Sequence, residues 1–271
     1  MATPTEPVLD VQALKKTYQT RQGGVEAIAE LTFAVKPGEF VCIVGPSGAG
    51  KTTLLRCIGG LLAPTSGQVV LAGNKVTGPP KDMAVVFQEY GRSLFPWLTV
   101  AQNVELPLKE KGLAKHLRTK LVTDSLDAVG LIDFADSHPW ELSGGVQQRV
   151  AIARAVAYEP KVLMMDEPFA AVDAQTRADL EDLVRSLWSR LGITVLFVTH
   201  DIEESVYLAE RVVVLSARPT VVLDVVDVDL SVERDQLTTR SSPRFAELRA
   251  EVYSLVQAAK RGERSTTSAV D

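Results

Sequence analysis

The first residues along the chain whose types and spacing could bind a ligand or catalyse a reaction form a glycine-rich run. This run directly follows a short apolar segment at residues 40–44. The run consists of Gly45, Pro46, Ser47, Gly48, Ala49, Gly50, Lys51, Thr52 and Thr53. Its spacing, GxxxxGK(S/T), lets backbone N–H groups turn inward around phosphate oxygens, at the positive end of the helix that follows. We expect Lys51 to reach the β- and γ-phosphates of a nucleoside triphosphate and Thr52 to bind Mg²⁺. The alternative is a chance turn, which the position between a buried strand and a helix disfavours.

A pair of carboxylates ends a second apolar run, at residues 162–165. Asp166 and Glu167 are adjacent, and successive strand residues point to opposite faces, so the two side chains would have different roles. Asp166 suits the binding of Mg²⁺, and Glu167 suits the polarisation of an attacking water. Taken alone, such a pair is more often a solvated strand end. The glycine-rich run favours the catalytic interpretation.

The third motif, LSGGVQQR at residues 142–149, is a second potential anion-binding helix start. Ser143 can cap the helix, while Gly144 and Gly145 leave N–H groups accessible. A purely local cap is the alternative for a bare Ser-Gly-Gly. The complete string resembles the LSGGQ-type signature of ABC (ATP-binding cassette) ATPases, and the resemblance extends from about residue 8 to the last helix.

The resemblance assigns further residues one at a time. Tyr18 would stack on adenine, Gln88 would sense Mg²⁺ and the attacking water, Asp173 would be the D-loop aspartate, and His200 would contact the γ-phosphate. The implied catalytic residues are Glu167, His200 and Gln88, and the implied metal ligands are Thr52, Gln88 and Asp166. The implied nucleotide-binding residues are Tyr18, residues 45–53, Ser143, Gly144, Gly145, Gln147 and Asp173. Each could instead have an ordinary packing or surface role, and their shared order and spacing is what makes the set specific.

Two positions depart from the usual family pattern. Val146 stands where methionine or glutamine is common, and Ala171-Val172-Asp173 replaces the usual SALD or GALD. Every charged or phosphate-binding group is retained, so a degenerate, inactive cassette is not expected.

The elements that must position these residues can be read from the hydrophobic pattern. Strands are expected at residues 8–14, 27–35, 40–44, 68–71, 84–87, 162–165, 194–198 and 212–215. Residues 99–158 show helical periodicity without a convincing strand, and helices are expected at 175–191 and 243–259. The resemblance implies an α/β fold: a P-loop NTPase core with a mixed β-sheet and an N-terminal antiparallel β-subdomain, plus an inserted α-helical subdomain. The expected division is residues 1–88 with 160–222 for the core, 89–159 for the helical signature subdomain, and 223–271 for a C-terminal extension with an amphipathic helix and a frayed tail.

Composition limits the class of partner. The formal net charge is −5, so no overall basic field would hold a nucleic acid. Cys42 and Cys57 form no metal-binding pattern, which suits a reducing compartment. The first residues lack the features of a secretory signal, and no apolar run is long enough to span a bilayer. A membrane function would therefore need other chains to supply the spans.

The single glycine-rich loop and single signature imply a second chain. In ABC ATPases two cassettes pack head to tail, and each signature covers the γ-phosphate of the ATP held by the other. We therefore expect ATP and Mg²⁺ as cofactors, and a homodimer or a pair with a related ATPase subunit.

The segment 89–100 is unusually apolar for a loop and carries Leu94, Phe95 and Trp97. These residues could pack in the helical lobe, or dock one of two transmembrane permease subunits. LFPWLTV followed by NVELPL resembles the ATPases of nitrate, sulfonate and taurine importers. That resemblance implies a peripheral ATPase on the cytoplasmic side of the inner membrane, served indirectly by a solute-binding protein. A single-cassette ABC ATPase of cofactor assembly is the alternative, and a P-loop kinase or regulatory switch is disfavoured by the signature.

Overall fold

The computed structural model describes residues 6–21, 23–88 and 93–263. The chain forms two compact units, residues 1–80 with 194–271 and residues 81–193. The predicted frayed tail lies outside the described residues from position 264 onward, as do residues 89–92 of the apolar loop.

The first unit contains a mixed sheet with the strand order β5-β4-β1-β2-β10-β9-β3-β8. One side is antiparallel: β1 (Leu9–Thr20) pairs with β2 (Gly23–Val35) and with β4 (Ser66–Leu71), which pairs with β5 (Asn74–Lys75). On the other side, β3 (Phe40–Val44) lies parallel between β8 (Thr194–Val198) and β9 (Arg211–Leu215). The strand β10 (Thr220–Asp227) joins the two sides, antiparallel to β9 and parallel to β2.

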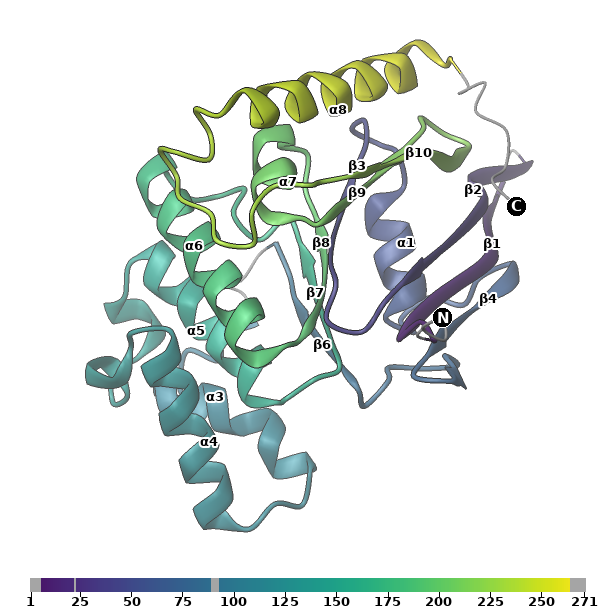
Figure 1. Ribbon diagram of the computed structural model, residues 1–271. Coiled ribbons are helices and arrows are strands. Elements are labelled where there is room, and N and C mark those ends of the chain that lie inside the picture. Colours follow the sequence, from purple (N-terminus) through teal and green to yellow (C-terminus); the bar gives the residue numbers. More distant parts are fainter. Residues whose placement is uncertain (1–5, 22, 89–92, 264–271) are drawn as a thin grey trace. The chain divides into compact units, whose positions relative to one another are not determined.

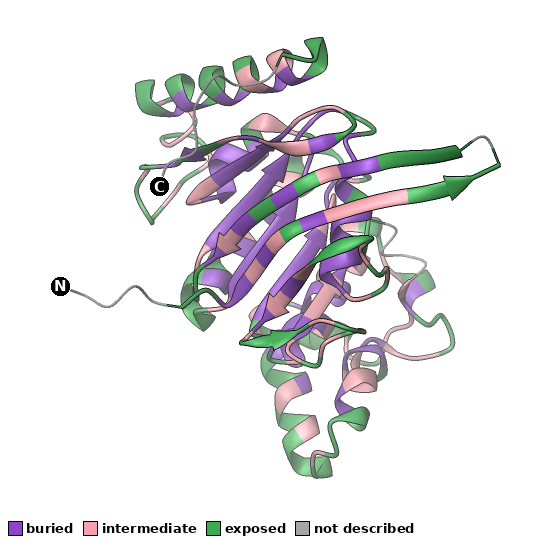
Figure 2. Ribbon diagram, turned by 90° about the vertical axis from the view of Figure 1, so that its right-hand side faces the viewer, coloured by how far each residue is buried: buried purple, intermediate pink, exposed green. Residues whose placement is uncertain are grey.

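Burial follows the sequence pattern of these strands. Every residue of β3 and β8 is buried, as expected for continuous apolar runs in the interior of a parallel sheet. The hairpin of β1 and β2 extends beyond the predicted limits into polar residues, and the last residues of β1 and the first residues of β2 are exposed (Figure 2). The central strands therefore provide a rigid base for the loops at their ends.

In the described part of the first unit there are three helices. The helices α1 (Lys51–Ile58) and α7 (Ile202–Leu208) each follow a central strand. The predicted C-terminal helix is α8 (Pro243–Arg261), which contacts α7, β9 and β10 (Figure 1). Ser242 caps its start, and its buried face is the apolar stripe Phe245, Leu248, Val252, Val256 and Ala259.

The second unit has two parallel strands, β6 (Met83–Val86) and β7 (Val162–Asp166). Between them in sequence lie α3 (Val100–Glu110), α4 (Lys115–Ala128), the short 3₁₀ turns Ile132–Phe134 and Pro139–Glu141, and α5 (Gly144–Ala157). The prediction that residues 99–158 are helical is confirmed, and α5 packs against both α3 and α4 (Figure 1). The helix α6 (Ala174–Leu191) follows β7.

The strand β10 was not among the predicted strands. Its Val-rich sequence carries a strand signal, but its residues do not alternate regularly between buried and exposed, and two of them, Asp224 and Asp227, are aspartates. The last strand of the sheet along the chain, β10, ends at Asp227. Across residues 6–21, 23–88 and 93–263, no helix combines the length and apolarity that a membrane span requires.

Candidate nucleotide site

The glycine-rich run forms a tight loop between β3 and α1. Gly50 occupies the cap position of α1 with φ 78° and ψ 12°, a left-handed conformation that favours glycine. A side chain at Gly45 would also be crowded, because an added Cβ would lie 3.0 Å from the carbonyl oxygen of Leu215. The backbone thus needs glycine at both ends of the loop, and this brings successive N–H groups to the start of α1.

Lys51 is the first residue of α1 and is only 7% exposed. Its ammonium donates to the carbonyl oxygens of Gly45 at 3.0 Å and Pro46 at 3.3 Å. The charge is therefore held within the turn of the loop, where a phosphate could replace carbonyl oxygens as its partner. Thr52, the next residue, is exposed and offers an oxygen of the kind that Mg²⁺ prefers.

Tyr18 belongs to the same neighbourhood as the loop. Its hydroxyl lies 3.2 Å from the hydroxyl of Thr53, in the first turn of α1. The ring is 37% exposed and has the Lys16 ammonium 5.4 Å from its centre. The structure thus places an accessible aromatic face next to the phosphate-binding loop, as stacking on a base requires.

A residue that the sequence did not indicate supports this loop. Thr220, the first residue of β10, is fully buried, and its hydroxyl lies 2.5 Å from the carbonyl oxygen of Ala49 and 2.9 Å from that of Ala27. It also lies 3.2 Å from the position of a Cβ added to Gly50. Thr220 is 171 residues from Ala49 in sequence, so no local pattern could have identified it.

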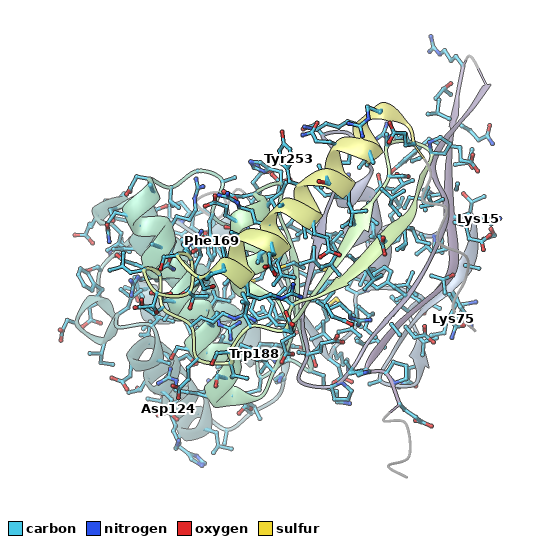
Figure 3. The ribbon with its side chains drawn as sticks, turned by 45° about the horizontal axis from the view of Figure 1, so that its top comes forward. Lys15, Lys75, Asp124, Phe169, Trp188 and Tyr253 are labelled. Atoms are coloured by element: carbon cyan, nitrogen blue, oxygen red, sulfur yellow. The ribbon has the colours of Figure 1, made fainter. Side chains whose placement is uncertain are left out.

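His200 follows the carboxyl end of β8, and the glycine-rich loop follows the carboxyl end of the neighbouring strand β3. The strands are parallel neighbours with Ile43 opposite Val198, so Gly45 and His200 each lie two residues beyond a paired position. The backbone N–H of Thr199 donates to Ile43 at 3.2 Å, and the Thr199 hydroxyl accepts from Asp201 at 3.0 Å. His200 is exposed, at the rim of a groove of about 740 Å³ between the start of α7 and α8. Tyr253 of α8 lines the same groove (Figure 3).

In the second unit, Gln88 and Glu167 follow the ends of two neighbouring parallel strands, β6 and β7. Val86 of β6 is opposite Met165 of β7, so the two polar residues each lie two positions beyond the last pair of a parallel ladder. Asp166 is the final residue of β7 and is half-buried, and Gln88 is exposed. The carboxyl ends of the two strands therefore gather an amide and two carboxylates at one edge.

The backbone at Glu167 is strained. Its φ is 43°, in the left-handed region that costs a non-glycine residue about 1–2 kcal/mol. The carbonyl oxygen of Glu167 accepts from the backbone N–H of Ala170 at 3.2 Å, and Phe169 in the same turn is buried, at 1% exposed (labelled in Figure 3). Among the described residues, Ala13, Ala72 and Glu159 also have positive φ, so the angle alone does not mark a site. Here the strained residue is the second of two adjacent carboxylates, directly after the end of β7.

The signature segment forms the expected helix start. Ser143 caps α5, and its hydroxyl accepts from Val146 at 3.5 Å. Ser143 and Gly144 are exposed, and the first N–H groups of the helix have no acceptor within the helix. Gln147 donates to the carbonyl oxygens of Pro139 at 2.9 Å and Leu142 at 3.2 Å, so its side chain fixes the turn before the cap.

Asp173 caps α6 and contacts the signature helix indirectly. Its carboxylate accepts from the backbone N–H of Thr176 at 3.0 Å and from the Thr176 hydroxyl at 2.7 Å. These two hydrogen bonds lower the pKa of Asp173. The methyl group of Thr176 in turn lies only 2.5 Å from the position of a Cβ added to Gly145. The start of α5 therefore packs directly on the first turn of α6.

The apolar loop divides into buried and exposed residues. Leu94 is 3% exposed, whereas Phe95 is 38% and Trp97 is 68% exposed. The prediction that Leu94 contributes to a docking surface is wrong, because its side chain packs inside the unit. Phe95 and Trp97 remain available, with their rings 5.4 Å apart in an edge-to-face arrangement.

A buried parallel strand that opens through a glycine-rich loop into a helix defines a P-loop nucleotide-binding protein. Comparison with known proteins narrows this class. The sequence profile of the ABC transporter family matches residues 28–170. The chain is 44% identical to the nitrate import ATP-binding protein NrtD of Synechocystis sp., over 92% of this chain and 95% of NrtD. It is 39% identical to the taurine import ATP-binding protein TauB of Roseobacter denitrificans, over 92% and 93% of the two chains.

A solved structure of an ATP-binding cassette is also similar to this chain. The dimeric post-hydrolysis state of the ATP-binding cassette MJ0796, bound to ADP and Pi, has a TM-score of 0.71 and 34% identity, over 82% of this chain and 100% of that one. The protein belongs to the ABC transporter family as an ATP-binding ATPase. The predicted fold and cofactor ATP are confirmed.

Proposed function

We propose that this chain is the ATP-hydrolysing subunit of an importer for a small anionic or zwitterionic solute, of the nitrate, sulfonate or taurine type. The observation that carries the proposal is the presence of two helix starts suited to an anion, α1 after the glycine-rich loop and α5 at the exposed Ser143. Either could bind phosphate, and one triphosphate in one chain needs only the first. The second is explained if it serves a nucleotide held by another cassette.

The residues of the first unit hold the nucleotide. The N–H groups of residues 45–53 and the Lys51 ammonium bind the phosphates, and the exposed face of Tyr18 stacks on adenine. His200, at the same sheet edge as the loop, contacts the γ-phosphate. Thr220 holds the loop in place from beneath through Ala49.

The residues of the second unit carry out hydrolysis. Glu167 polarises the attacking water, and Gln88 at the neighbouring strand end orients it. The hydroxyl of Thr52, the carboxylate of Asp166 and the amide of Gln88 are oxygen donors that fit Mg²⁺. Mg²⁺ held by oxygens of this kind would neutralise charge on the β- and γ-phosphates.

Two copies, or this chain and a related ATPase subunit, pack head to tail. Ser143, Gly144 and Gly145 of one cassette then cover the γ-phosphate held by the other, and Asp173 lies beside the shared site. Their N–H groups supply charge stabilisation of the kind that arginine fingers supply in other P-loop enzymes. That the MJ0796 cassette is dimeric with ADP and Pi bound supports a pair of cassettes.

The exposed pair Phe95 and Trp97 docks a transmembrane permease subunit. Aromatic anchors are typical of such interface centres.

The complex comprises two permease subunits and a solute-binding protein on the outer side, with this chain peripheral on the cytoplasmic face. In this arrangement residues 89–159 are the helical signature subdomain inserted into the α/β core. The names of NrtD and TauB support an import role.

Glu167→Gln tests the catalytic assignment. The variant should bind ATP normally and accumulate an ATP-bound dimer, with turnover reduced by at least about 100-fold. Glu159→Gln is the matched control, because Glu159 is an exposed glutamate of the same unit that also has a positive φ. Gel filtration with ATP measures the dimer, and a Lys51→Ala variant should lose nucleotide binding. Normal turnover of Glu167→Gln would remove Glu167 from the catalytic role.

The import role is tested in the reconstituted complex. ATPase activity should rise when the permease subunits and a loaded solute-binding protein are present, with nitrate, taurine and an alkanesulfonate as the candidate solutes. An ATPase rate that ignores the permease subunits would contradict the proposal.

A further inference from the structure

The exposed aromatic pair belongs to a short segment, residues 93–99, which we call the docking segment. Beyond Ser93, which is helical, its residues 94–99 form a turn in which Leu98 donates its N–H to the carbonyl oxygen of Phe95 at 3.1 Å. A segment of this kind would be poorly positioned by its own backbone. Two polar side chains from helices of the same unit hold it instead.

The first of these is Asn103 of α3, which is fully buried. Its side-chain oxygen accepts from the N–H of Phe95 at 2.8 Å. Its amide nitrogen lies 3.1 Å from the carbonyl oxygen of Phe95, 3.1 Å from that of Leu98 and 3.0 Å from that of Thr99. One side chain thus satisfies polar groups at both ends of the turn that presents Phe95 and Trp97, and any rearrangement of the turn would leave buried polar groups without partners.

The second is Arg154 of α5. One guanidinium nitrogen donates to the carbonyl oxygen of Ser93 at 2.6 Å, and the other donates to the Ser93 hydroxyl at 2.8 Å. Two parallel hydrogen bonds from a planar group fix orientation as well as distance. Burial lowers the pKa of Arg154, yet a guanidinium remains charged in proteins, so the interaction is charge-assisted.

The helix that carries Arg154 begins at the signature. Ser143 caps α5, and Arg154 lies 11 positions further along the same unbroken helix of 14 residues, about 16 Å away. Most residues from Val150 to Ala157 are buried. A displacement at one end of a helix packed in this way moves the other end with it.

We propose that Arg154 and Asn103 are positioning residues that make the docking segment a rigid extension of the signature helix. When Ser143 moves to cover a nucleotide, Phe95 and Trp97 therefore move with it. This inference rests on the proposed function, because it takes the nucleotide at one end of α5 and the permease subunit at the other. The inference goes beyond the proposed function by naming Arg154 and Asn103 as the side chains that connect the docking segment to α5. It predicts that the docking segment does not move independently of α5.

A purely structural role of Arg154 would give a different result from a coupling role. Loss of packing alone would lower stability and reduce all activities together. Loss of coupling would separate the response of the docking segment from the response of the signature. Arg149 is a matched control, since it lies on the same helix and donates to the carbonyl oxygen of Val129 at 3.1 Å, away from the docking segment.

Hydrogen exchange in the full chain provides the direct test. In the Glu167→Gln background, ATP should slow exchange both at the start of α5 and across residues 93–99, the latter about fivefold or more. Adding Arg154→Met should preserve the response at the start of α5 and reduce that of residues 93–99 to less than twofold. Arg149→Met should retain both responses. Ser93→Ala, which removes only the hydroxyl partner, should give an intermediate loss without endangering the fold.

The outcomes separate the two proposals. Protection at the start of α5 with none at residues 93–99 in the Glu167→Gln parent, or an unchanged response in Arg154→Met, would overturn the inference. If ATP gave no protection from exchange at the start of α5, the proposed dimer would be contradicted, and the inference would fail with it. In the reconstituted complex, Arg154→Met should keep basal ATPase within about twofold and lose most of the permease-dependent stimulation. Equal stimulation of Arg154→Met and the unaltered complex would also overturn it.

Discussion

Substitution of Gly145 by alanine tests the packing between the signature helix and α6. A Cβ at this position would lie 2.5 Å from the methyl carbon of Thr176, well inside van der Waals contact. The threonine cannot rotate away freely, because its hydroxyl donates to Asp173 at 2.7 Å. Either this hydrogen bond breaks or the two helices separate.

The expected cost follows from two opposing contributions. Overpacking of this kind costs about 1–3 kcal/mol. Replacing glycine by alanine in a helix returns up to about 1 kcal/mol. The net loss of about 1–2 kcal/mol should lower the urea midpoint of the second unit by roughly 0.5 M. Equilibrium unfolding followed by the fluorescence of Trp97, Trp140 and Trp188, all of which belong to this unit, reports the change.

A second substitution separates packing from nucleotide chemistry. Thr176→Ser removes the obstructing methyl group and keeps the hydroxyl that bonds Asp173, so the double variant should recover most of the lost stability. Gly78→Ala is the control, because a Cβ there meets no atom within 4 Å. If the double variant regains stability but not ATPase activity, Gly145 is needed at the phosphate as well as for packing. A Gly145→Ala variant as stable as the parent, or one that Thr176→Ser fails to rescue, would refute the reasoning.

Two further predictions concern Thr220 in the first unit and Asp173 in the second. Thr220→Val should lower the free energy of unfolding by about 1–3 kcal/mol, because buried carbonyl oxygens at Ala49 and Ala27 lose their donor, and should weaken ATP binding, both measurable by calorimetry. An unchanged nucleotide affinity would exclude a supporting role for Thr220. The pKa of Asp173 is lowered in the folded state, so its stabilising contribution is present above its ordinary pKa of about 3.9 and is lost as the pH falls through the lower folded value. The stability difference between the parent and Asp173→Asn should therefore be constant from pH 7 to 5 and shrink below about pH 4, and a difference that grows toward acid pH would contradict this sign.

The parts of the fold that sequence could predict are those with strong local signals. The strands β3 and β8 are continuous apolar runs, and the helix starts at Ser143 and Asp173 carry good capping residues. The glycine-rich loop combines glycines at fixed spacing with a following helix. In each case the local physics and the tertiary structure favour the same conformation.

The features that escaped prediction depend on contacts between distant residues. Thr220 reaches Ala27 across 193 positions, and its strand was not predicted. Arg154 reaches Ser93 across 61 positions, and a lone arginine in a helix carries no sign of its partner. Leu94 and Trp97 are similarly apolar in sequence, and only packing decides that the first is buried and the second exposed.

These contacts explain why α5 must be a single unbroken helix. Its first turn lies against α6 at Gly145, and its later residues hold the docking segment through Arg154. If α5 bent between Gly145 and Arg154, the movement of Ser143 would be absorbed within the helix instead of reaching Trp97. The residues between these two points include no glycine or proline, and Val150, Ile152 and their alanine neighbours are buried against the adjoining helices. A bend there would need a cavity in this packed core, at a cost of several kcal/mol. The stiffness of α5 is therefore a property of its packing, and α5 can carry displacement from the nucleotide end to the docking end only as long as that core remains filled.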